Sequence, residues 1–218
     1  MYVFLFAIGS VFASFANLIV IRKIRNESIV YPPSHCDTCG HRLYIRDLMP
    51  CLSYISLKGK CRYCKSKITL ESFMVELILG ILLVITFDFS NIIGSILIFL
   101  ALMLGLIISL IDLKTFDIYM YQIGILAILG FFYRYLNFGY DLKFFYITIG
   151  FCACYGIIYL LSKGGIGNGD VYFYLSLFLF IENEFIIYFV LISIWIGAVY
   201  GIFVFLKYKS MKIEIPFC

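Results

Sequence analysis

Long apolar runs limit the folds open to this sequence more than any other feature. A helix needs roughly 20 residues to cross the ~30 Å hydrocarbon layer of a bilayer. Six runs approach that length, and a seventh, near 171–181, is shorter and needs covering neighbours or interfacial flanks. We therefore expect an all-α polytopic membrane protein with about seven transmembrane helices. The six longer runs lie at about 2–21, 70–87, 91–111, 118–136, 143–162 and 185–206.

The composition supports a lipid-embedded chain. Apolar residues make up 63% of the 218 residues, mean hydropathy is +1.02, and only 14% of residues are charged. That is more apolar surface than one soluble core of this size could bury. Residues 2–21 are apolar from the start with no basic segment before them, which favours an uncleaved membrane anchor over a signal peptide.

Basic residues predict the orientation. Ten of the 17 lysines and arginines lie between Arg22 and Lys67. Alternating the spans from an outside N-terminus puts 15 of them on one side and leaves only Arg134 and Lys143 on the other. The positive-inside rule makes the basic side cytoplasmic, so we expect a multi-pass membrane protein with its basic loop in the cytoplasm. A basic loop beside anionic lipids accounts for the net charge of +4, and we expect no nucleic-acid partner.

This reading divides the chain into three parts. We expect residues 1–22 to form a first transmembrane helix, residues 23–69 a cytoplasmic four-cysteine loop that binds zinc, and residues 70–218 a transmembrane helical bundle. No internal repeat is evident, and nothing in the sequence predicts the oligomeric state.

The loop carries two C-x-x-C pairs with 21 residues between them. Two such pairs can close a tetrahedral zinc site with no open position, so we expect a structural, ribbon-like zinc site. Two disulfides or free thiols are the alternatives, and a reducing cytoplasm disfavours the disulfides. His35 and His41 flank the first pair and are more readily explained as solvated or supporting side chains. The predicted ligands are Cys36, Cys39, Cys61 and Cys64.

Two aspartates stand where apolar runs meet the predicted cytoplasmic side. Asp112 ends the third span, and Asp170 begins the sixth directly after a glycine-rich turn that includes Gly167 and Gly169. Ionisable groups at membrane depth are costly and usually functional, and glycines allow close backbone approach. Two neighbouring carboxylates share one proton, so one can activate water while the other protonates a scissile carbonyl. The pattern predicts aspartic peptidase chemistry.

The simpler alternative is that Asp112 only ends a span and that Asp170 only caps a helix, where aspartate is favoured. Asp117 is a rival for the first catalytic position, but it lies beyond the span. These alternatives remain open on helix ends alone.

These motifs, in the order in which they follow one another along the chain, resemble the bacterial type IV prepilin peptidase family, including its competence-associated members. More distantly they resemble the G-x-G-D intramembrane aspartic proteases. The resemblance runs through nearly the whole chain. Besides the four cysteines and the two aspartates, the matching positions are Gly9, Ser10, Asn17, Arg22, Glu76, Gly80, Lys114, Gly167, Gly169 and 215–217.

The resemblance implies catalysis by Asp112 and Asp170, with Gly167, Gly169 and Lys114 as supporting motif residues. It implies a prepilin or pseudopilin substrate, cut at the cytoplasmic face after a short basic leader. Many members also methylate the new N-terminus with S-adenosylmethionine. Glu76 and Gly80 would then be candidates for that activity, with helix packing as their simpler role.

Some positions depart from the family pattern. Tyr119 and Met120 stand where the family usually has Pro-Asp or Pro-Asn, and Tyr172 stands where it often has lysine. The sequence ends at Cys218, where relatives commonly continue, so we expect a trimmed or naturally short member. The competing functions are a non-catalytic scaffold of a pilus, secretion or DNA-uptake machine, and an ion transporter, which the placement of both acids at one face disfavours.

Overall fold

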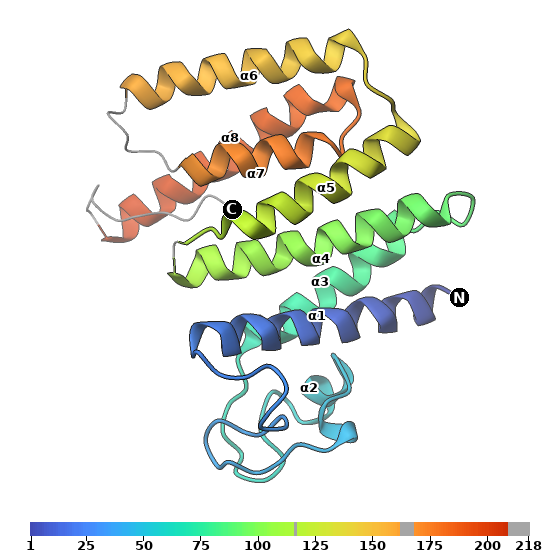
Figure 1. The fold of residues 1–218 in the computed structure, drawn as a ribbon. Helices are drawn as coiled ribbons and strands as arrows, with labels where there is room; N and C mark the ends of the chain where they lie inside the picture. The colour runs from blue at the N-terminus through green and yellow to red at the C-terminus, as the bar shows by residue number, and fades with distance from the viewer. Residues whose placement is uncertain (116, 162–167, 209–218) are drawn as a thin grey trace. The chain divides into compact units, whose positions relative to one another are not determined.

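The computed structural model describes residues 1–115, 117–161 and 168–208. These residues form eight α-helices and one short 3₁₀ helix, and they contain no β-strand beyond two isolated bridges (Figure 1). The all-α prediction is therefore confirmed. The elements are α1 (Tyr2–Ile24), η1 (Ile45–Asp47), α2 (Leu52–Ser56), α3 (Leu70–Thr86), α4 (Ile92–Thr115), α5 (Met120–Asn137), α6 (Leu142–Leu161), α7 (Asn168–Phe178) and α8 (Asn183–Tyr208).

Four of the described helices are long and apolar enough to cross a membrane, which makes the chain an integral membrane protein. They are α1, α4, α6 and the Asn183–Phe203 part of α8. Helix α3 has 17 residues, α7 has only 11, and α5 is not among the four. The number of seven spans therefore stays a prediction.

The chain divides into two compact units, Met1–Ile111 and Asp112–Cys218. In the first unit, α1 packs on α3 with their backbones almost touching at Gly9 and Gly80. A Cβ built on Gly9 would lie 2.9 Å from the Gly80 Cα atom and 2.9 Å from the Leu79 carbonyl oxygen. Small residues of this kind let membrane helices approach closely. The Ser10 hydroxyl adds a hydrogen bond across the contact to the Glu76 carbonyl oxygen, at 3.1 Å.

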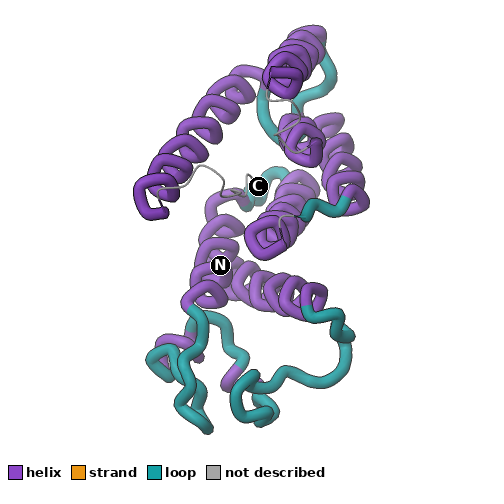
Figure 2. The backbone as a smooth tube through the Cα atoms, turned by 90° about the vertical axis from the view of Figure 1, so that its left-hand side faces the viewer, coloured by secondary structure: helices purple, strands orange, loops and turns teal. Residues whose placement is uncertain are grey.

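The segment between α1 and α3 is almost entirely loop, broken only by short helical turns (Figure 2). Arg22, at the end of α1, ties it to the helix. Its guanidinium is buried and donates to three loop carbonyls, those of Ser28 (2.8 Å), Ile29 (2.9 Å) and Pro32 (2.6 Å). One cation thus fixes where the chain turns back from the membrane helix into the loop.

In the second unit, α7 contacts α5 and α6, and α6 contacts α8. Its core is an aromatic and aliphatic cluster built on three buried side chains, those of Phe144, Phe178 and Ile186. The Phe178 ring makes an edge-to-face contact with Phe151, with ring centroids 4.9 Å apart. The short helix α7 is therefore held on the inside of this unit.

Candidate functional site

The four cysteines of the loop form one compact cluster. Their sulfur atoms all lie within 4.8 Å of one another, and the Cys36 and Cys64 sulfurs are 3.8 Å apart. Tetrahedral coordination with Zn–S bonds of ~2.3 Å requires sulfur separations of ~3.8 Å. The structure thus brings together all four cysteines that the spacing singled out, at distances that fit a single zinc ion.

The backbone repeats itself around the two cysteine pairs with an offset of 25 residues, a repeat that the sequence reasoning missed. The Cys36 N–H donates to the His41 carbonyl (3.0 Å), as the Cys61 N–H donates to Ser66 (2.8 Å). The bond from Leu43 to Ser34 is matched by one from Ile68 to Gly59. Gly40 and Lys65 follow the second cysteine of each pair with positive φ values of 68° and 61°.

Thiol acidity within the cluster is uneven. Backbone N–H groups, first that of Cys39, lower the pKa of Cys36 to about 6, and the hydroxyl of Ser66 lowers the pKa of Cys64. The pKa of Cys39 is raised to about 11, because desolvation and the Cys64 and Cys36 thiols outweigh the N–H of His41. The Cys36 and Cys64 thiols therefore oppose ionisation of the Cys39 thiol. A bound divalent cation would offset this repulsion between thiolates.

Neither histidine belongs to the cysteine cluster. The His41 ring lies against Tyr63 with centroids 3.6 Å apart, and His35 Nδ1 lies 3.0 Å from the Pro33 carbonyl oxygen. Asp47 stiffens the same part of the loop. Its pKa is lowered by the Arg62 guanidinium, which donates to it at 2.6 Å, and by the Tyr44 N–H.

A cavity of about 290 Å³ lies between the cysteine loop and helices α1 and α3. Glu76 lines it from α3, and its carboxylate accepts a hydrogen bond from the Cys51 N–H at 2.7 Å. The carbonyl oxygen of the Asn17 side chain is buried without a hydrogen-bond partner, while the amide nitrogen donates to Ser72, a lining residue. The sequence reasoning did not predict this cavity, although it named Glu76.

Gly80 follows Glu76 by one helical turn and serves close packing. A Cβ at Gly80 would lie 2.5 Å from the Ser10 hydroxyl oxygen and 2.7 Å from the Phe6 ring. This is the simpler of the two roles that the sequence left open for Gly80, and a part in methyl transfer stays a prediction.

The first candidate carboxylate, Asp112, lies in the last turns of α4 with only 5% of its surface exposed. It follows the buried Leu110 and Ile111 directly. Lys114 and the rival Asp117 are both exposed. Burial therefore distinguishes Asp112 from Asp117, and the catalytic role of Asp112 stays a prediction.

The second candidate carboxylate, Asp170, is partly buried in the first turn of α7. Gly169 beside it faces Ile118, whose Cδ1 would lie 3.1 Å from a Cβ at that position. The start of α7 thus packs on the segment that follows α4 by a few residues. Gly167 lies outside the described residues. That Asp112 and Asp170 work as a pair stays a prediction.

Two family models match this chain. The Bacterial Peptidase A24 N-terminal domain matches residues 7–89, and the Type IV leader peptidase family matches residues 97–202. Together they take in most of the chain, including the cysteine cluster and both aspartates.

Individual proteins that are named as leader peptidases match shorter segments of this chain. A prepilin leader peptidase/N-methyltransferase of Myxococcus xanthus is 40% identical over 80 residues, which cover 37% of this chain and 24% of the relative. Its Vibrio cholerae counterpart is 39% identical over 85 residues, 35% of this chain and 34% of the relative. A type 4 prepilin-like proteins leader peptide-processing enzyme of Escherichia coli is 45% identical over 51 residues, 23% of this chain and 19% of the relative. The match thus spans at most 34% of these relatives, and no solved structure matches.

Proposed function

Because this chain belongs to the type IV leader peptidase family, we propose that it is a membrane aspartic endopeptidase that removes the leader peptides of type IV prepilins or pseudopilins. The cut falls at the cytoplasmic face of the bacterial inner membrane, where the basic loop meets anionic lipids. The relatives named as leader peptidases support the substrate class.

Asp112 and Asp170 are the proposed catalytic pair. The single observation that carries this assignment is the burial of Asp112 at the end of α4, beside a segment that packs on the start of the Asp170 helix. Two close carboxylates share one proton. The ionised member removes a proton from the attacking water, and the protonated member donates its proton to the carbonyl oxygen of the scissile peptide.

The supporting motif residues act through geometry. Gly169 lets α7 begin against Ile118, where any larger side chain would press on that neighbour. Lys114 lies in the last turn of α4, where a cation complements the helix dipole. In this proposal they hold the two carboxylate-bearing helix ends in place and do not take part in proton transfer.

Carboxylate-to-amide substitution tests the assignment. Co-expressed prepilin should keep its leader when the enzyme carries Asp112→Asn or Asp170→Asn, at unchanged enzyme abundance, whereas Asp117→Asn should process it normally. Gel mobility of the pilin and mass spectrometry of its N-terminus give the readout. Retained processing in Asp112→Asn and Asp170→Asn would favour the scaffold function instead.

The cysteine cluster is the proposed site of one structural zinc ion. All four ligands come from the protein, so no coordination position is left for substrate. The hydrogen bonds repeated around the two cysteine pairs support a closed, two-knuckle site of this kind. Binding would join the two halves of the loop, which the Asp47–Arg62 ion pair already links.

The cavity beside the loop is the proposed site of S-adenosylmethionine. That molecule, when bound, supplies a methyl group from a cationic sulfonium. The lining carboxylates of Asp37 and Asp47 are paired with Arg25 and Arg62, so the group that would face a cation carrying an amino group is the carboxylate of Glu76. The side-chain oxygen of Asn17 has no hydrogen-bond partner and could accept one from the amino group. Asn17 lies on the same face of α1 as the lining residues Ser14 and Ile21.

Binding and methylation can be separated from cleavage. Glu76→Gln should weaken equilibrium binding of radiolabelled S-adenosylmethionine to the purified protein and reduce methylation of the mature pilin, while leader removal continues. Glu71→Gln, an exposed change at the start of the same helix α3, is the matched control. Equal binding by both variants and wild type would exclude the cavity as the cofactor site.

A further inference from the structure

Arg134, near the end of α5, is completely buried in the second unit, with 0% of its surface exposed. Its guanidinium donates to the carbonyl oxygens of Phe178 (3.3 Å) and Ile181 (3.0 Å), and to the side-chain oxygen of Asn183. A buried cation in a chain of membrane helices is costly and usually functional. The groups that Arg134 binds, at the end of α7 and just beyond it, indicate its role.

The carbonyls that Arg134 binds belong to the end of α7 and the turn after it. With 11 residues, α7 is ~16 Å long, about half of what a bilayer crossing needs. Its last carbonyls therefore fall inside the protein, where water cannot satisfy them. The turn bonds the Ile181 N–H to the Phe178 carbonyl, and the guanidinium caps the end. A cation there also complements the dipole of α7.

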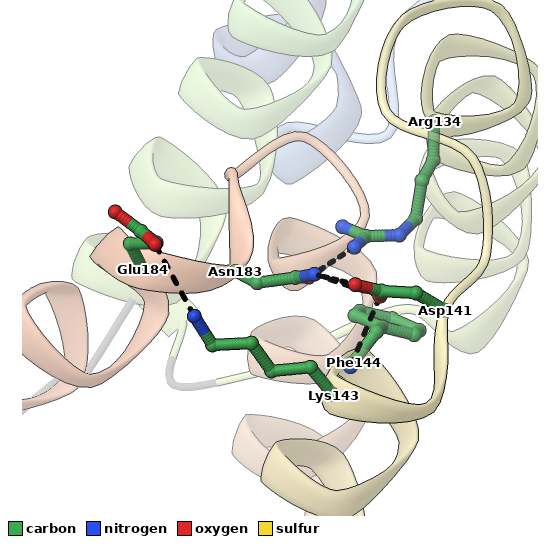
Figure 3. A network of polar contacts seen from close by, with 6 residues as sticks. All are labelled: Arg134, Asp141, Lys143, Phe144, Asn183 and Glu184. Atoms are coloured by element: carbon green, nitrogen blue, oxygen red, sulfur yellow. Dashed lines mark hydrogen bonds and ion pairs between the residues drawn. The ribbon is translucent and has the colours of Figure 1, made fainter.

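Among the described residues, the charge of Arg134 is compensated without a direct ion pair (Figure 3). The Asn183 amide accepts from Arg134 and donates to both carboxylate oxygens of Asp141, at 2.7 and 2.9 Å. The guanidinium also lies 3.7 Å from the centroid of the Phe144 ring, a cation–π contact. Asn183 thus links the buried cation to an exposed anion across three helix ends.

Close packing at the same level supports the cap. A Cβ at Gly130, one turn before Arg134 on α5, would lie 2.7 Å from the Leu179 Cβ atom. The backbone of α5 therefore touches the chain just beyond α7. At the other end of α7, Gly169 meets Ile118. The short helix is fixed at both ends, and the fixed end at Arg134 is rigidly connected to Asp170, which lies eight residues or ~12 Å away.

We propose that Arg134 is a positioning residue, which fixes the C-terminal end of α7 against α5 and thereby sets the depth of Asp170 in the membrane. This role rests on the proposed function, because it acts through Asp170. Arg134 does not contact substrate. Misplacement of a reacting group by about 1 Å can cost on the order of 100-fold in rate, so a small slip of α7 is enough to matter.

The test compares Arg134→Met and Arg134→Lys with wild type in purified full-length protein. Arg134→Met should lower kcat for prepilin cleavage on the order of tenfold to 100-fold, leave KM nearly unchanged, and shift the acidic limb of the pH profile as the surroundings of Asp170 change. Arg134→Lys keeps one cationic donor and should recover part of the rate. The matched control is Lys143→Met, which breaks the neighbouring exposed Lys143–Glu184 pair (3.3 Å) and leaves α7 untouched.

Hydrogen–deuterium exchange provides a readout that does not depend on activity. Amides in 177–181 should exchange faster in Arg134→Met and keep wild-type rates in Lys143→Met. If Arg134→Met does not fold, Asn183→Ala removes one acceptor of the guanidinium together with the link to Asp141. It keeps the bonds from Arg134 to the Phe178 and Ile181 carbonyls and should give a smaller change in the same direction. Unchanged exchange and an unchanged pH profile in the folded variants would overturn the positioning role alone. A wild-type protein that cleaves no prepilin would overturn the proposed function as well.

Discussion

The contact between α1 and α3 makes a sharp prediction, because the two glycines that form it face different neighbours. A Cβ at Gly9 meets backbone, the Gly80 Cα atom and the Leu79 carbonyl oxygen, each at 2.9 Å. A Cβ at Gly80 meets side chains, the Ser10 hydroxyl and the Phe6 ring, at 2.5–2.8 Å. Side chains can rotate away, whereas backbone moves only with its helix. Gly9→Ala should therefore be more damaging than Gly80→Ala.

The expected cost follows from the overlap. Forcing an extra carbon into a packed contact typically costs about 1–3 kcal/mol. Alanine regains about 0.5–1 kcal/mol through its better helix propensity. Because the Gly9 contact is with backbone, its cost lies in the upper part of that range, about 2–3 kcal/mol. Gly9→Ala should thus lose about 1–2.5 kcal/mol net, and Gly80→Ala about 1 kcal/mol or less. At about 2–4 °C per kcal/mol for a chain of this size, Gly9→Ala should unfold about 2–10 °C below wild type.

Thermal unfolding in detergent, followed by circular dichroism, measures these differences. Gly124→Ala in α5 and Gly150→Ala in α6 are the controls, since a Cβ at either position meets nothing within 4 Å in the described structure. Both should match wild type or unfold at a slightly higher temperature. If Gly9→Ala matched these two controls, the backbone contact between α1 and α3 would be wrong.

Three further outcomes follow from the structure. Metal analysis should find about one zinc per chain, absent in Cys36→Ser and retained in Cys152→Ser. The pKa of Asp141 is lowered by the Asn183 amide, so this pair adds stability above the unfolded carboxyl pKa of ~3.9. That stability is lost as pH falls through the lower folded value, and Asn183→Leu should flatten the acid side of a melting-temperature profile. Arg22→Met should speed proteolysis within 26–34, because three carbonyls lose their donor.

The cysteine cluster was the part of the site most open to sequence reasoning. Each C-x-x-C pair is a local turn, so the spacing alone specifies the geometry of each half. The sequence could not show that Gly40 and Lys65 would take matching left-handed conformations, since lysine rarely adopts one. The 25-residue repeat is therefore seen in the backbone hydrogen bonds, but it could not be recognised from the residue types at matching positions.

The contacts of Arg134, by contrast, could not be predicted from the sequence. The sequence reasoning used Arg134 only to assign a side of the membrane, because its partners lie 44 to 49 residues away. A lone arginine in an apolar run was the signal, and the short run after Asp170 was its complement. The contact between Arg134 and α7 could be predicted only by knowing that the end of α5 meets the end of α7, and no local sequence pattern gives that information.

Buried polar residues also affect how apolar a helix is by composition. Helix α5 falls outside the four apolar spans, yet two of its polar side chains, Gln122 and Arg134, are 6% and 0% exposed. Such residues lower the mean hydropathy of a helix without presenting a charge to lipid. The cost of insertion depends on what the outer face carries and on whether inner polar groups are bonded. In α5 both terminal nitrogens of the Arg134 guanidinium are bonded, whereas Arg134 Nε and the Gln122 side-chain oxygen are buried without a partner among the described residues. Helix α5 thus meets this condition only in part, and a span at α5 stays a prediction.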